Sequence, residues 1–137
     1  MKKQGLLIDT SVWIEFFRGD PSVRDLIGGW ASEDRIFTAG PILYELMQGI
    51  RLRGERVAVK EALLSTRYLD LTSEDWEEAG ALSRELRAGG LTLPMTDLLV
   101  GQLARTRHLM VVSHDSHFES IPGIPFKKMP LTARSHR

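Results

Sequence analysis

Short apolar runs alternate along the chain with longer segments whose apolar residues recur every three or four positions. The short runs are typical of buried β-strands and predict strands at 5–9, 35–39, 68–71, 109–114 and 124–128. The longer segments predict helices at 11–18, 22–33, 41–53, 55–66, 73–88, 95–107 and, briefly, 115–120. Because strands and helices alternate, we expect an α/β domain whose strands pair in parallel through right-handed crossovers.

The composition bounds the architecture and the compartment. With 137 residues, 42% of them apolar, the chain can bury one core, so we expect a single domain over 1–137 with a flexible polar tail at 131–137. No apolar stretch approaches the roughly 20 residues of a membrane helix. Only four apolar residues separate the basic amino terminus from Asp9, too few for a secretory signal. We therefore expect a cytoplasmic protein that does not enter a membrane.

Charge and cysteine content narrow the possible chemistry. The chain has no cysteine, which rules out disulfides and thiolate metal sites. Its 18 basic and 18 acidic residues give a formal net charge of zero, so any nucleic-acid affinity must come from a local patch. The groups that could form such a patch, or could simply be solvated faces, are Arg51, Arg53 and Arg56; Arg84 and Arg87; Arg105, Arg107 and His108; Arg18; and Lys127 with Lys128.

Four acidic residues stand at junctions of the predicted elements. Asp9 and Asp115 each end an apolar run, while Glu45 and Asp97 fall in the first turns of helices that begin near a proline. In a parallel α/β sheet, the carboxyl ends of strands and the amino ends of helices share one edge, where ligands bind. The pattern therefore brings four carboxylates together, and oxygen donors of this kind suit a divalent cation.

Each acid also has an ordinary structural explanation. Asp9 and Asp115 could cap helices, Asp97 could complement a helix dipole, and Glu45 could lie on an exposed helix surface. We favour the metal interpretation because four unpaired carboxylates at one partly buried edge would repel one another and raise their pKa values. A bound Mg²⁺ or Mn²⁺ removes that conflict.

A cation held by carboxylates indicates hydrolysis of a phosphodiester. A water retained by the ion is acidified and can attack phosphorus in line. The sequence shows no Ser–His–Asp or cysteine nucleophile, so a covalent intermediate is not expected. Thr10 and Ser11, directly after Asp9, could bind a phosphate oxygen or a metal-bound water, or could instead cap the helix that begins near Val12.

Four segments carry a resemblance to a known family. In chain order they are Leu6–Trp13 (LLIDTSVW), Leu43–Leu46 (LYEL), Leu93–Val100 (LPMTDLLV) and Val112–Phe118 (VSHDSHF). Together they resemble the signature segments of PIN-domain ribonucleases. Their order and the chain length are similar to those of VapC toxins from bacterial and archaeal toxin–antitoxin pairs.

The resemblance implies a fold, an activity and partners. The fold would be a PIN-like three-layer α/β/α sandwich around a central, mainly parallel five-stranded sheet. The activity would be a Mg²⁺- or Mn²⁺-dependent endoribonuclease, and its catalytic and metal-binding residues would be Asp9, Glu45, Asp97 and Asp115. The partners would be RNA, a cognate VapB-type antitoxin and a second copy in a homodimer. Two other functions stay open, a structure-selective DNA nuclease of similar architecture and a non-catalytic PIN-like binding module.

Two features leave details of the site and of the partner surface open. Many relatives carry a further aspartate two residues after the fourth acid, where this chain has His117 as a possible auxiliary residue. Imidazole is a poorer ligand for Mg²⁺ than for Mn²⁺ or Zn²⁺, so the number of bound ions is open. His114 and His117 are expected at surface positions. Trp13, Phe16 and Phe17 fall on one predicted helix, either as a core stripe or as an exposed aromatic surface for an antitoxin segment.

Overall fold

The computed structural model describes residues 3–50 and 53–129, so the tail expected at 131–137 lies outside the described residues. The centre of the fold is a five-stranded sheet in the order β3-β2-β1-β4-β5, with every adjacent pair parallel. All five predicted strands are present, each shorter than predicted. Their bounds are β1 Leu6–Ile8, β2 Ile36–Ala39, β3 Arg67–Leu69, β4 Met110–Ser113 and β5 Phe126–Lys128.

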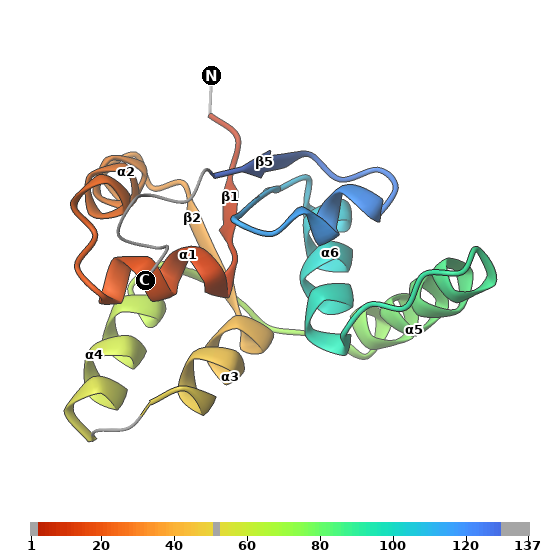
Figure 1. Ribbon diagram of the computed structural model, residues 1–137, viewed down its shortest axis with the longest axis horizontal. Coiled ribbons are helices and arrows are strands. Elements are labelled where there is room, and N and C mark those ends of the chain that lie inside the picture. The colour runs from red at the N-terminus through yellow and green to blue at the C-terminus, as the bar shows by residue number, and fades with distance from the viewer. Residues whose placement is uncertain (1–2, 51–52, 130–137) are drawn as a thin grey trace.

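Helices cover both faces of this sheet. In Figure 1, α1, α2 and α4 lie on one side of the strands and α5 and α6 on the other. This arrangement confirms the three-layer α/β/α architecture that the resemblance implied. The bounds are α1 Thr10–Phe17, α2 Pro21–Ser32, α3 Gly40–Gln48, α4 Arg53–Leu64, α5 Ser73–Ala88 and α6 Met95–Arg107, with a 3₁₀ helix η1 at Ser116–Ser120.

The prediction of one helix over 41–53 is wrong at its carboxyl end. Helix α3 stops at Gln48, and the Gly49 amide donates to the Leu46 carbonyl three residues back at 3.1 Å. That bond tightens the last turn instead of continuing the α-helix. The pattern was misleading because Ile50 continues the apolar stripe of α3 although the helix has already ended.

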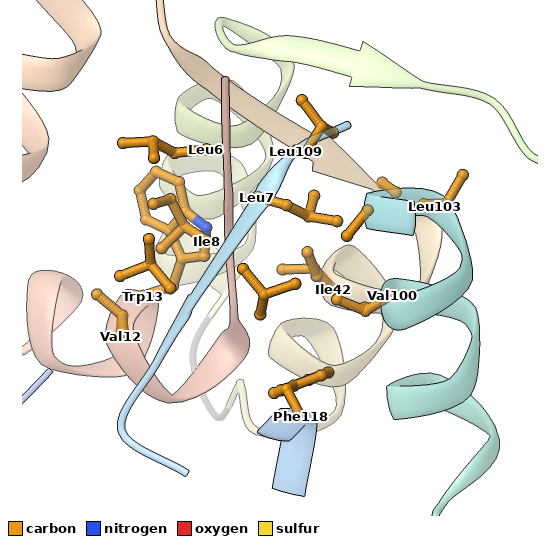
Figure 2. Packing of buried hydrophobic residues seen from close by; sticks show 14 of the residues in the cluster. Leu6, Leu7, Ile8, Val12, Trp13, Ile42, Val100, Leu103, Leu109 and Phe118 are labelled. Atoms are coloured by element: carbon orange, nitrogen blue, oxygen red, sulfur yellow. The ribbon is translucent and has the colours of Figure 1, made fainter. Parts of the chain in front are cut away.

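The core is built around β1, whose three residues are all buried. Strand side chains alternate between faces, and Figure 2 shows Leu7 directed toward Val100 and Leu103 of α6. Leu6 lies on the opposite side, toward Trp13 of α1. Packing on both faces fixes the height of β1 in the sheet, and with it the position of the residue that follows, Asp9.

The predicted exposed aromatic surface on the first helix is wrong for Trp13. Its side chain is only 2% exposed and belongs to the core. Phe16 and Phe17 are half-buried, and the Phe17 ring stacks on Trp13 at 5.8 Å between centroids. The stripe therefore packs mainly inward, which was the first of the two interpretations. No helix within the described ranges is long and apolar enough to cross a membrane.

Candidate functional site

Three carboxylates from distant parts of the chain meet at the carboxyl edge of the sheet. Asp9 follows β1, and its backbone amide donates to the Val112 carbonyl of β4 at 2.9 Å, which extends the β1–β4 pairing by one residue. Glu45 comes from α3 and Asp97 from the first turn of α6. One carboxylate oxygen from each of the three lies within 4.8 Å of the other two. Asp9 is buried, and the other two are half-buried.

No lysine or arginine balances the charges of this cluster among the described residues. Among the residues that the structure describes, no lysine or arginine forms an ion pair with Asp9, Glu45 or Asp97. The pKa of Asp97 is raised to about 6, first because burial removes water from the carboxylate, and then because Asp9 and Glu45 repel its charge. A hydrogen bond from His117 opposes this rise. The cluster therefore favours a positively charged ligand.

Two threonines hold the Glu45 carboxylate from opposite ends. Thr10 Oγ1 donates to Glu45 Oε1 at 2.8 Å, and Thr96 Oγ1 donates to Oε2 at 3.1 Å. Each oxygen keeps a lone pair for a further ligand, because a carboxylate oxygen can accept more than one bond. The sequence singled out Thr10 but missed Thr96. In the sequence, the position of Thr96 beside Asp97 in the first turn of a helix was the one indication that it belongs to the site.

Two serines hold the Asp9 carboxylate. Ser11 Oγ and Ser113 Oγ donate to Asp9 Oδ2 at 3.0 and 2.7 Å. The same hydroxyls accept backbone amides from the turn after β4, Ser11 from His114 at 3.1 Å and Ser113 from Asp115 at 2.9 Å. Ser113 is fully buried and was missed, although a polar residue at the end of an apolar strand could have marked it. Asp9 makes no side-chain cap to α1, so the capping explanation fails for this residue.

Asp115 is not brought into the three-carboxylate cluster. Its side chain is 44% exposed, and its Oδ1 accepts the His117 amide at 3.0 Å as the cap of η1. The capping explanation therefore holds for this acid. Its Oδ2 lies 3.1 Å from Nδ1 of His117, and the same Nδ1 lies 3.5 Å from Oδ2 of Asp97. The imidazole thus connects the fourth acid to the other three.

The two histidines differ in their surroundings. His117 is 54% exposed, as expected. His114 is half-buried, and its Nδ1 lies 3.0 Å from the Met129 carbonyl just after β5, so the expected surface position is wrong for this residue. The His114 ring is bound to the residue that follows β5. No described contact joins this ring to Asp9, Glu45 or Asp97.

The predicted basic patch at Arg105, Arg107 and His108 is not beside the acidic cluster. Arg107 and His108 line a hollow of about 480 Å³ together with Gly5 and Leu109, which directly precede β1 and β4. This hollow is therefore at the amino edge of the sheet, opposite the carboxylates. Arg107 is also committed to the buried carboxylate of Asp75, where Nη2 donates to Oδ2 at 2.9 Å. Arg51 lies outside the described residues.

The donor set fits a divalent cation. Three carboxylates offer hard oxygen ligands within 4.8 Å of one another, and burial together with the charges of Asp9 and Glu45 raises the pKa of Asp97. Hydroxyl groups rather than cations orient Asp9 and Glu45, so the negative charge stays available for an ion. Zinc sites are usually built from nitrogen and sulfur ligands, and the three clustered residues offer only oxygen.

Comparisons with known proteins identify the family and the fold of this chain. The model of the PIN domain family matches residues 6–124. Ribonuclease VapC11 of Mycobacterium tuberculosis is 29% identical over 126 residues, which cover 87% of this chain and 92% of that protein. Among solved structures, DNA-bound VapBC from Salmonella typhimurium has a TM-score of 0.78 at 25% identity, covering 92% of this chain and 98% of that one. VapBC2 from Rickettsia felis, bound to a promoter DNA fragment, has a TM-score of 0.79 at 19% identity, covering 90% and 98%.

Proposed function

Because this chain belongs to the PIN domain family, we propose that it is a metal-dependent endoribonuclease and the toxin of a VapBC-type toxin–antitoxin pair. The observation that carries the proposal is the cluster of Asp9, Glu45 and Asp97, with which no lysine or arginine of the described residues forms an ion pair. The relatives support the substrate class, since one is named a ribonuclease VapC. Neighbouring structures are named as VapBC complexes, which supports an antitoxin of the VapB type as the partner.

In the proposed mechanism, Asp9, Glu45 and Asp97 hold Mg²⁺ or Mn²⁺. When bound, such an ion supplies a water of lowered pKa for in-line attack on phosphorus and stabilises the charge that develops there. The chain fixes the ligand oxygens beforehand, because the hydroxyls of Thr10 and Thr96 clamp both oxygens of Glu45. Preorganised ligands need little rearrangement when the substrate arrives.

Thr10 and Ser11 have a role in this mechanism that differs from phosphate binding. Both hydroxyls already donate to carboxylates, Thr10 to Glu45 and Ser11 to Asp9. We therefore assign them to orienting the ligands. Asp115 is connected to Asp97 through the imidazole of His117, so we assign it to holding that ring and not to binding the ion.

The proposed antitoxin surface includes helix α1. Phe16 and Phe17 remain half-buried and Ile14 is 38% exposed, so they offer apolar area to an amphipathic segment, whereas Trp13 does not. Replacing Phe17 with Ser is expected to weaken capture of the co-expressed antitoxin at least tenfold, in line with the loss of a large aromatic contact. Unchanged antitoxin affinity in a folded Phe17→Ser protein would remove this surface from the proposal. The homodimer expected from the resemblance stays a prediction.

The test of the function uses purified protein, freed of antitoxin, on single-stranded RNA and on DNA of the same sequence. We expect cleavage of RNA with millimolar Mg²⁺ or Mn²⁺, none in excess EDTA, and a higher melting temperature when the ion is present. Undiminished RNA cleavage in excess EDTA would refute the metal-dependent mechanism. Cleavage of DNA alone would favour the structure-selective nuclease, and ion binding without cleavage would favour the binding module.

A further inference from the structure

The imidazole of His117 contacts two carboxylates, of which Asp97 belongs to the three-carboxylate cluster and Asp115 does not. Nδ1 lies 3.1 Å from Asp115 Oδ2 and 3.5 Å from Asp97 Oδ2. The backbone amide of His117 also donates to the other oxygen of Asp115, at 3.0 Å. Both oxygens of Asp115 are thus engaged by one residue, and the cap of η1 fixes the backbone from which the ring projects.

A second divalent ion at this site would have to share this space with the ring. Asp97 is the only acid of the three-carboxylate cluster that contacts His117 among the described ion pairs. An ion bridging Asp97 and Asp115 would need an oxygen of each at about 2.1 Å. Nδ1 of His117 already lies 3.5 Å from the Asp97 oxygen and 3.1 Å from the Asp115 oxygen.

We propose that His117 takes the place of a second metal ion, so that the site binds one divalent cation and the imidazole links Asp115 to Asp97, a ligand of that cation. The proposal rests on the proposed function for the identity of the first ion site. It does not depend on the charge of the ring, because Nδ1–H donates to a carboxylate in the neutral tautomer and in the imidazolium alike. It assigns His117 as a positioning residue, not a metal ligand.

The two possible roles of His117 predict different numbers of bound ions when the residue is replaced. If the ring occupies the position of an ion, replacing it with a carboxylate opens a second site and raises the number of ions bound. If Nδ1 is itself a ligand of the first ion, the same replacement leaves that number unchanged.

The experiment counts Mn²⁺ by titrating the protein and measuring the free ion by electron paramagnetic resonance. We expect one Mn²⁺ per chain for the parent and two for His117→Asp. His108→Asp is the matched control, because His108 is exposed, lies beside the hollow at the amino edge, and has a φ of 55° that aspartate tolerates. This control should bind one Mn²⁺, like the parent.

The outcomes separate this proposal from the proposed function. Two Mn²⁺ in the parent, or one in folded His117→Asp, would overturn it. If His117→Asp does not fold, His117→Glu decides in the same titration: two bound Mn²⁺ support the proposal, and one overturns it. A parent that binds no Mn²⁺ refutes both proposals, whereas one bound Mn²⁺ without RNA cleavage refutes only the function.

Discussion

Replacing Asp97 with Asn separates the metal role of this residue from a structural role. Asn is nearly isosteric with Asp, but it carries no charge and cannot titrate. In the metal-free protein the pKa of Asp97 is raised from 3.8 to about 6 by burial and by the neighbouring carboxylates. The folded state therefore resists ionisation of this side chain, and the substitution removes that cost.

The pH range of the effect follows from the direction of the shift. Below about pH 4 the carboxyl is protonated in the folded and unfolded states, so parent and variant are expected to have similar stability. Between about pH 4 and pH 6 the unfolded chain releases this proton while the folded chain keeps it, so the parent loses stability across this range. Above pH 7 the full difference is present, and Asp97→Asn is expected to be more stable than the parent in EDTA.

The size of the effect can be worked from the same shift. A rise of roughly two pH units corresponds to about 3 kcal/mol at most. The side chain is 16% exposed, and screening by solvent at this open edge reduces the expected gain to about 1–2 kcal/mol. For a domain of this size, that is a rise in melting temperature of roughly 3–8 °C at pH 7.5. Cleavage of RNA with Mg²⁺ should fall more than about 100-fold, because a bound ion loses a charged ligand.

The assay compares thermal melts of parent and Asp97→Asn in EDTA at pH 4 and pH 7.5, and RNA cleavage with Mg²⁺. Asp25→Asn is the control, since Asp25 is an exposed aspartate on α2 and its replacement should change neither quantity. Near-parental cleavage by Asp97→Asn would refute its assignment as a ligand. A large loss of metal-free stability at pH 7.5 would instead show that the carboxylate supports the fold.

Three further substitutions test the surrounding structure. Ser113→Ala removes a fully buried hydroxyl and leaves the Asp115 amide without its acceptor, so we expect a loss of about 1–3 kcal/mol in denaturant unfolding and weaker Mn²⁺ binding. Arg107→Gln removes the partner that lowers the pKa of Asp75 to about 2; the variant should be less stable at pH 7, and the difference should shrink as the pH falls from 4 to 2, because the parent loses this stabilisation when Asp75 is protonated. Gly101→Ala would place a Cβ 2.5 Å from Cδ1 of a buried isoleucine, and this overpacking is expected to cost about 1–3 kcal/mol in the same unfolding assay.

Local sequence patterns predicted the architecture well because strand and helix periods are short-range properties. Helices α5 and α6 have the predicted bounds, and each parallel strand was found from its apolar run. Where the pattern failed, tertiary position or backbone conformation decided. Ile50 looked like the next residue of the α3 stripe, but the helix had ended at Gln48. The pattern left Trp13 either in the core or exposed to a partner, and the structure places it in the core.

By itself the sequence predicted that Asp9, Glu45, Asp97 and Asp115 would share one edge, because the carboxyl ends of parallel strands and the amino ends of helices meet there whatever the details of packing. The structure brings the first three into one cluster and leaves Asp115 outside it. Only the tertiary structure decided how those groups are held. Thr96 reaches Glu45 across 51 residues and Ser113 reaches Asp9 across 104. Such contacts depend on the relative height and rotation of packed elements, which the interior packing sets and no local pattern records.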